Sequence, residues 1–350
     1  MKIIFLGETF RADAKSWING IEMYSNSKMH TLEIPVYKYR IFRIFSSFIF
    51  LLKCLITYFQ KSYDISLAER STSYGFFSLF VNSRVKVVAQ QGITDIYPPT
   101  LFSKVFKAYL QKITYKNVDL IHSWGSVMVP EMLRSCAHPS KIIIKPKGIN
   151  LNFYSFKFKH PNIFKNTIIV TRSLEKDYRH IDIIEAGRLL KDYFNVEFKI
   201  TIVGSGSLYR KMVQLVNKYN LSDCIDFVGR IPNESLPELL KQHFIYLSVP
   251  ETEGVSSSLM EAMASGCIPV VTDLPGNRAF IKPGYNGELV KIMDPEDIAS
   301  KILHVLKNSD KYRLGILQNR KWIEKNANFH VNMKYFFNLY NEKLNQKCAG

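Results

Sequence analysis

Two glutamates and a run of serines stand close together in SVPETEGVSSSLMEAMASGCIPVV, residues 248–271. Glu253 and Glu261 lie on either side of the serine cluster Ser256 to Ser258. Serine hydroxyls and free backbone N–H groups are donors that suit an anion, whereas carboxylates accept hydrogen bonds from hydroxyl groups. The residue types therefore predict an anion-binding turn with two acids beside it.

The flanking residues predict a strand before this turn and a helix after it. FIYLSVP (244–250) is an apolar strand-like run, and SLMEAMASG (258–266) is typical of a short helix with Gly266 just past its end. The turn ETEGVSS thus follows a strand and opens a helix, where Gly254 permits close approach of a ligand to the backbone. A second interpretation remains open: Ser258 and Glu261 have capping-box spacing, and Glu253 is then a solvated loop acid.

The whole chain repeats this alternation of strand and helix. Apolar runs such as NTIIVTRS (166–173) and FKITIVGSG (198–206) alternate with helical patterns such as IDIIEAGRLLKDYF (181–194). Such a pattern predicts an α/β fold with buried parallel sheets, and 350 residues are enough for two domains. We predict an N-terminal domain over 1–150, a linker over 151–165, a C-terminal domain over 166–328 and a final helix over 329–350.

The positive charge is concentrated in the first half of the chain. The net charge is +17; residues 1–165 carry 23 Lys or Arg against 9 Asp or Glu, whereas residues 166–350 carry 24 against 21. This excess suits an anionic lipid, a nucleic acid or an acidic substrate. The five cysteines form no paired pattern and the histidines have no ligand spacing, so we expect reduced thiols, a cytoplasmic setting and no metal.

The segment IFRIFSSFIFLLKCLITYF (41–59) is the only one of membrane-spanning length. Arg43 and Lys53 interrupt it, and a central lysine is costly in a bilayer. A core helix is favoured, followed by an amphipathic helix in the plane of a membrane. The apolar run MKIIFL at the start is shorter than the core of a signal peptide, so export is not expected.

The order of residues around the serine cluster resembles a known family. P-x-x-E-G from Pro250, E-A-M-A-x-G-x-P-V-V from Glu261 and GYNGELV (284–290) are similar to the donor-binding signature of family 4 retaining glycosyltransferases. VTRSLEKDY (170–178), IVGSG (202–206) and DFVGRIPNESLPELL (226–240) resemble further segments of that family. The resemblance covers about residues 85–345 and implies a GT-B fold: two Rossmann-like parallel-sheet domains facing across a cleft, with a C-terminal helix that crosses back to the N-terminal domain.

The resemblance also implies a role for each matched residue. Glu253 would bind the hydroxyls of the donor sugar and Glu261 those of the ribose, while Arg172 and Lys176 would neutralise the diphosphate. The spacing of Lys176 departs from the family by one residue, so Arg179 is an alternative. The donor-binding residues implied are Gly204, Gly206, Gly229, Arg230, Gly254, Val255, Ser256, Ser257, Ser258, Leu259 and Glu261; the catalytic ones are Glu253, Arg172, Lys176 and Asp95.

The implied reaction is retaining and needs neither a metal nor a cofactor. The donor is a UDP- or GDP-sugar, and the acceptor, a glycan or a lipid-linked molecule, would bind the N-terminal domain in assembly of a bacterial surface polysaccharide. Asp95 is the main acceptor-side candidate, ahead of Asp13 and Trp17, and Gln91 replaces a histidine common in the family. The basic N-terminal half favours an enzyme at the inner face of an anionic membrane.

Three other functions compete with this one. A sugar-nucleotide epimerase of GT-B fold also uses paired acids. GSGSLY (204–209) partly matches a dinucleotide-binding fingerprint of oxidoreductases, but Tyr209 stands where a small residue is required. A nucleic-acid binder is supported by charge alone.

Overall fold

The chain forms two compact units. The computed structural model describes residues 1–35, 40–90, 101–156 and 166–349. The first unit comprises Met1–Lys147 and Phe329–Gly350, and the second comprises Gly148–Asn328. The division falls at Lys147, and residues 148–156 belong to the second unit, whereas 157–165 of the predicted linker lie outside the described residues.

The first unit is built on a parallel sheet with the strand order β2-β1-β3-β4-β5-β6. Its strands are β1 (Ile3–Leu6), β2 (His30–Leu32), β3 (Tyr63–Glu69), β4 (Ser83–Gln90), β5 (Leu120–Ser123) and β6 (Ile142–Ile144). The runs of apolar residues in β1, β3 and β5 are buried, as expected for a sheet covered on both faces. The helices are α1 (Ala12–Ser25), α2 (Arg40–Gln60), α3 (Tyr74–Ser78), α4 (Leu101–Asn117), α5 (Val129–Arg134) and α14 (Phe329–Ala349).

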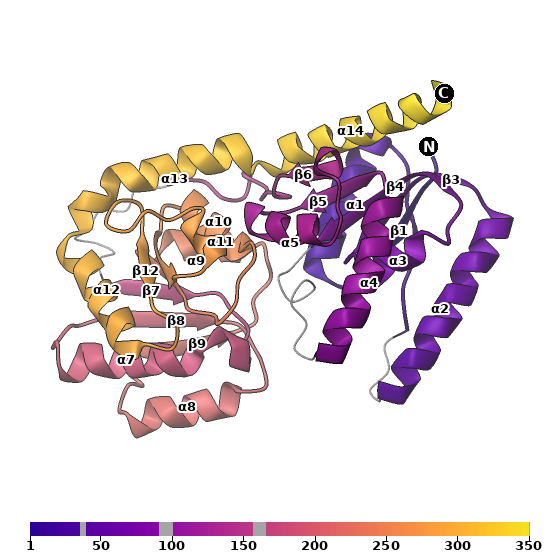
Figure 1. Cartoon of the computed structure of the whole chain (residues 1–350). Helices are drawn as coiled ribbons and strands as arrows, with labels where there is room; N and C mark the ends of the chain where they lie inside the picture. Colours follow the sequence, from indigo (N-terminus) through magenta and orange to yellow (C-terminus); the bar gives the residue numbers. More distant parts are fainter. Residues whose placement is uncertain (36–39, 91–100, 157–165, 350) are drawn as a thin grey trace. The chain divides into compact units, whose positions relative to one another are not determined.

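Helix α14 is the last helix of the chain and packs in the first unit, against α1 and β4 (Figure 1). The close approach depends on Gly20 of α1, where an added Cβ would lie 2.5 Å from the side chain of Met333. The expectation that a C-terminal helix returns to the N-terminal domain is therefore confirmed.

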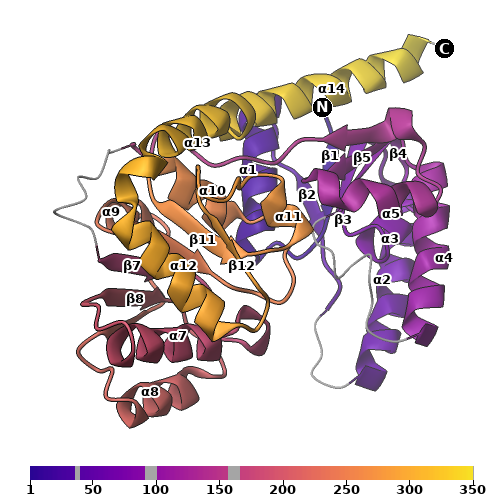
Figure 2. The same ribbon diagram turned by 60° about the vertical axis from the view of Figure 1, so that its left-hand side comes forward.

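The second unit contains another parallel six-stranded sheet, in the order β12-β11-β10-β7-β8-β9. Figure 2 labels β7, β8, β11 and β12 of this sheet. Its strands are β7 (Thr167–Val170), β8 (Lys199–Val203), β9 (Ile225–Gly229), β10 (Ile245–Ser248), β11 (Ile268–Thr272) and β12 (Glu288–Val290). Its helices are α7 (His180–Asp192), α8 (Tyr209–Lys218), α9 (Leu236–Lys241), α10 (Ser257–Ala264), α11 (Pro275–Arg278), α12 (Pro295–Lys307) and α13 (Arg313–Asn326).

Successive residues of strand β7 point into two different apolar clusters. Ile168 and Val170 pack with residues of α7 and α12, whereas Ile169 packs with residues of α10 and α13. The sheet is thus covered by helices on both faces, which confirms the predicted parallel α/β architecture. Helix α12 has Asp294 as its N-cap: the Asp294 side chain accepts a hydrogen bond from the Asp297 N–H, and Pro295 stands in the first turn.

Candidate functional site

The residues that the sequence singles out in the second unit come from neighbouring strands. Strands β10, β7, β8 and β9 are adjacent and parallel, so their carboxyl ends meet at one edge of the sheet. Arg172 follows β7, Gly204 follows β8, Arg230 follows β9 and Glu253 follows β10. This edge is where ligands bind in open parallel sheets.

Arg172 is the centre of a polar cluster at this edge. Its Nε donates a hydrogen bond to the Ser248 hydroxyl at 3.0 Å, and one terminal nitrogen donates to the Ser256 hydroxyl at 2.5 Å. The same nitrogen forms an ion pair with the Glu253 carboxylate, and the Tyr178 ring lies 5.4 Å from the guanidinium. A cation, two hydroxyls and a carboxylate are therefore held together by residues that are far apart in the sequence.

Helix α10 opens beside this cluster. Ser256 is its N-cap, and the Ser256 hydroxyl accepts a hydrogen bond from the Leu259 N–H. The N–H groups of Ser257 and Ser258 donate to no other residue that the structure describes, as expected in the first turn of a helix. The capping-box interpretation is wrong, because the helix begins before Ser258 and Glu261 lies too far along it to reach back to the cap.

Glu261 lies in the second half of α10 and is half-buried. Burial raises the pKa of its carboxyl group to about 7, although a hydrogen bond from Tyr154 and the charge of Arg172 act in the opposite direction. Because the pKa is close to neutral, groups that donate hydrogen bonds to this carboxyl would shift it toward the ionised form.

The two candidates for a second cation differ in their surroundings. Arg179 pairs with both oxygens of Asp182, at 2.8 and 2.9 Å, and with Glu251 at 3.3 Å. These contacts occupy its guanidinium and give Glu251 a partner. Lys176 is exposed, and its ammonium group pairs with no residue in the described part of the chain.

The predicted glycines occupy positions where the backbone is crowded or bent. A Cβ on Gly204 would lie 2.3 Å from the Arg172 carbonyl oxygen, and one on Gly206 would lie 2.4 Å from that of Leu174. These glycines let the loop after β8 pack against the loop that carries Arg172. Gly229 has a φ of 77° at the end of β9, and the adjacent Arg230 is exposed. The buried Gly254 touches Gly276, where a Cβ would lie 2.3 Å from the Gly254 carbonyl oxygen.

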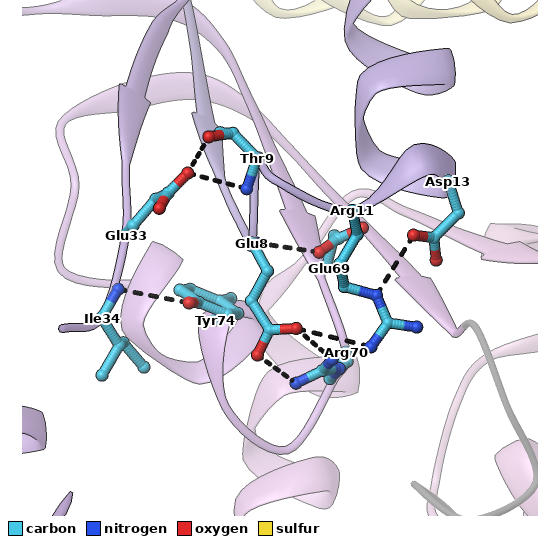
Figure 3. Close-up of polar contacts among 9 residues, drawn as sticks. All are labelled: Glu8, Thr9, Arg11, Asp13, Glu33, Ile34, Glu69, Arg70 and Tyr74. Atoms are coloured by element: carbon cyan, nitrogen blue, oxygen red, sulfur yellow. Dashed lines mark hydrogen bonds and ion pairs between the residues drawn. The ribbon is translucent and has the colours of Figure 1, made fainter. Parts of the chain in front are cut away.

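Figure 3 shows the corresponding edge of the first sheet, which is rich in carboxylates. Arg70 has a left-handed backbone with φ of 58°, and its two terminal nitrogens donate to the Glu8 carboxylate at 3.0 and 2.7 Å. Glu69 and Glu33 accept hydrogen bonds from the N–H groups of Glu8 and Thr9. The loop after β1 is therefore fixed by side chains that follow β2 and end β3.

Asp13 lies beside this network. Its carboxylate pairs with Arg11 at 3.2 Å, and the Lys147 ammonium donates to its carbonyl oxygen at 2.8 Å. Burial opposes ionisation of Asp13, but the charges of Lys147 and Arg11 outweigh it and lower the pKa of its carboxyl group. Trp17 is fully buried among aromatic rings, so it is a core residue. Asp95 and Gln91 lie outside the described residues.

Several residues of both edges were missed from the sequence. Ser248 contacts Arg172, and Tyr154 contacts Glu261. In the first unit, Glu8 and Arg70 form an ion pair at the edge of the sheet. Glu8 and Arg70 stand one or two residues after apolar strands, a position that could have singled them out. Tyr154 gives no such signal, because only the fold brings it to α10. The described residues contain no group of three His, Cys, Asp or Glu side chains that could hold a metal ion.

The surroundings of Arg172 lie within a region that matches a known family. Residues 155–327 match the family described as "Glycosyl transferases group 1". The second unit belongs to the group 1 glycosyltransferases. In this glycosyltransferase unit, Arg172, Glu253 and the start of α10 all fall inside the matched residues.

Individual relatives agree with the family. The chain is 32% identical over 172 residues to "Putative colanic acid biosynthesis glycosyltransferase WcaL" of Salmonella typhimurium, across 47% of this chain and 42% of that protein, less than half its length. It is 23% identical over 97% of its length to "Uncharacterized glycosyltransferase MJ1069" of Methanocaldococcus jannaschii, of which 92% is covered.

Solved structures extend the similarity to the whole fold. The crystal structure of Anabaena Alr3699/HepE in complex with UDP and glucose covers 98% of this chain and is itself covered completely, with a TM-score of 0.77 and 13% identity. This likeness confirms the predicted GT-B fold.

Proposed function

We propose that the chain transfers a sugar from a nucleotide-sugar donor to a glycan or lipid-linked acceptor, with retention of the anomeric configuration. The convergence of Arg172, Glu253 and Ser256 at the start of α10 carries this proposal. A nucleotide sugar joins an anionic diphosphate to hydroxyl-rich rings. A guanidinium and free helix N–H groups suit the first, and carboxylates suit the second.

Each group has a distinct task in this proposal. The N–H and hydroxyl groups from Val255 to Leu259 bind the diphosphate together with Arg172. Glu253 accepts hydrogen bonds from the donor sugar and Glu261 from the ribose. Gly204, Gly206, Gly229 and Arg230 form the rest of the donor edge. A UDP-sugar is the first choice because HepE was crystallised with UDP and glucose, and a GDP-sugar is the alternative.

The reaction requires charge stabilisation more than covalent catalysis. The acceptor hydroxyl oxygen bonds to the anomeric carbon as the bond from that carbon to the diphosphate breaks on the same face. The hydroxyl proton passes to a phosphate oxygen of the leaving nucleotide. Negative charge grows on the diphosphate, where Arg172 and the α10 N–H groups stabilise it, while the exposed Lys176 supplies the second cation. We propose that no divalent metal or cofactor takes part, so EDTA should leave the rate unchanged.

We propose further that the acceptor binds the first unit at the edge that includes Asp13, and that Asp95, which lies outside the described residues, takes part in binding it. WcaL is named for colanic acid biosynthesis, which supports a role in bacterial surface polysaccharide assembly such as O-antigen, capsule or exopolysaccharide. The basic first half of the chain supports a cytoplasmic enzyme that acts at the inner face of an anionic membrane on a lipid-linked acceptor.

A panel of UDP- and GDP-sugars tests the donor assignment. The purified chain should be stabilised against thermal unfolding by one donor class and should hydrolyse it slowly without acceptor. Glu253→Gln and Arg172→Ala should weaken both effects, and the anomeric signal of the product in NMR should show retention. If both variants kept full transfer activity, the assigned site would be wrong. Exchange or epimerisation of the donor sugar without acceptor would instead favour the epimerase.

A further inference from the structure

Helix α2 has two apolar faces, and the described residues of the protein cover one of them and leave the other exposed. Phe50 and Cys54 are buried in an apolar cluster with residues of β1, β3 and α3. Five large apolar residues on the other side of the helix are exposed. They are Phe45, Phe48, Leu52, Ile56 and Phe59.

The spacing of these five residues places them on one stripe. Steps of three and four positions return to the same side of an α-helix, so the stripe runs along the length of α2. Its members are well exposed: the fractions are 59% for Phe45 and 83% for Phe59. A continuous exposed apolar stripe of this kind marks an interaction surface, whereas a single exposed phenylalanine would not.

Helix α4 adds a second exposed face in the same unit. Val105, Phe106 and Tyr109 are exposed in its first half, and Lys112 and Lys116 are exposed further along. Helix α3 packs against both α2 and α4, and Figures 1 and 2 both show α2 and α4 flanking it. The two helices therefore belong to the same side of the first unit.

The charge of this pair of helices selects the kind of partner. Together α2 and α4 contain seven Lys or Arg and no Asp or Glu. Lys53 is exposed beside the apolar stripe of α2, and Lys61 is exposed just after that helix. No helix among the described residues is long and apolar enough to span a membrane. Exposed apolar side chains on helices whose charged residues are all basic suit the interface of a bilayer with anionic headgroups, where a helix can lie in the plane.

We propose that the exposed faces of α2 and α4 form a docking surface for an anionic lipid bilayer. The aromatic and aliphatic side chains of the α2 stripe enter the boundary between headgroups and acyl chains, and the lysines contact the headgroups. This inference refines the membrane association proposed above. It assigns the association to the exposed lysines Lys53, Lys112 and Lys116 on two helices and to one apolar stripe, instead of to the basic half of the chain as a whole.

Vesicle sedimentation of the full chain tests this surface. We expect binding to vesicles of phosphatidylglycerol and phosphatidylcholine in equal amounts, and little binding to phosphatidylcholine alone. The double variant Phe48→Ser, Phe59→Ser should lower the apparent affinity by about tenfold or more, because two rings that would enter the bilayer are lost. Lys53→Glu with Lys112→Glu should weaken binding in low salt more than in high salt.

Matched controls keep the result interpretable. Leu314→Ser removes an apolar side chain that is 68% exposed on α13 in the second unit, and it should leave vesicle binding unchanged. All the substituted residues are exposed, so far-UV circular dichroism and Tm should stay near those of the wild type. Thermal stabilisation by the nucleotide sugar in solution should also persist in the α2 variants, which separates this surface from the donor site.

Three results would overturn the proposal. The first is a wild-type chain that does not sediment with anionic vesicles. The second is an unchanged affinity of the Phe48→Ser, Phe59→Ser variant. The third is a wild-type chain that is a dimer by light scattering, combined with a monomeric Phe48→Ser, Phe59→Ser variant that binds vesicles as well as the wild type does. This result would assign the stripe to contact with a second copy of the chain.

Discussion

The carboxyl edges of the two sheets occupy the same position in similar architectures but differ in charge. In the second unit, the edge presents the Arg172 guanidinium, serine hydroxyls and free N–H groups around Glu253. In the first unit, carboxylates are abundant and fix the loop after β1. They are Glu8, Asp13, Glu33 and Glu69, facing Arg11, Arg70 and Lys147.

This difference shows that the fold provides the place for a ligand and the loop residues decide its kind. Donors and positive charge at the second edge suit a diphosphate. Acceptor-rich carboxylates at the first edge suit a ligand with many hydroxyl groups. The excess positive charge of the first half does not gather at this edge, because seven of its basic residues lie on α2 and α4.

Arg172→Ala should have the largest effect, because it removes the cation that lies beside Glu253 and Ser256. Loss of a charge-assisted contact to the leaving group should lower kcat by a factor on the order of 10²–10³. Steady-state kinetics with the donor found in the panel would measure it. Arg188→Ala, which changes a solvent-accessible arginine on α7, is the control and should retain normal kcat. Equal kcat of the two variants would contradict the proposal that positive charge at the second edge stabilises the leaving diphosphate.

Arg70→Ala should affect the acceptor and leave the donor alone. It breaks the ion pair that holds Glu8, so the acceptor KM should rise about tenfold while slow donor hydrolysis continues. Arg134→Ala breaks the exposed pair with Glu131 on α5 and serves as control. A parallel loss of donor hydrolysis in folded Arg70→Ala would contradict separate roles for the two edges.

Glu261 predicts a pH dependence that is confined to the second edge. Its pKa of about 7 exceeds the ordinary value near 4.5, so its contribution to stability is present at low pH and is lost as the pH rises through about 7. Glu261→Gln should therefore gain Tm relative to the wild type between pH 5 and pH 8, measured by thermal unfolding. Donor affinity of the wild type should increase over the same range, since the ionised carboxylate accepts hydroxyl hydrogen bonds. A difference in Tm between the two proteins that does not change with pH would show that the Glu261 carboxyl group does not titrate between pH 5 and pH 8.

Ser256→Ala should have the smallest effect on the fold. Loss of the N-cap hydrogen bond to Leu259 should lower the free energy of unfolding by about 1 kcal/mol. Ser257→Ala, one residue along in the first turn, should cost less in chemical denaturation. Because Ser256 also accepts from Arg172, donor affinity should fall as well; a purely structural cap would change stability without changing affinity.

The sequence predicted the parts of this protein that depend on local patterns. Continuous apolar runs identified the parallel strands. The order of residues from Pro250 to Gly266 predicted a turn between a strand and a helix, because strand, turn and helix are consecutive there. The cap was misplaced by two residues, since Ser256 and Ser258 are equally good N-cap residues and only the backbone decides between them.

Tertiary structure decided everything that depends on residues distant in the chain. The contacts of Arg172 with Ser248 and Ser256 join segments more than 70 residues apart, and Arg70 reaches Glu8 across 62 positions. Helix α2 is an equally clear case. Its apolar sequence favours both a core helix and a membrane helix, because hydrophobicity alone does not say which side is covered. The packing of Phe50 and Cys54 fixes one face in the core, and the same packing leaves Phe48 and Phe59 exposed to a partner.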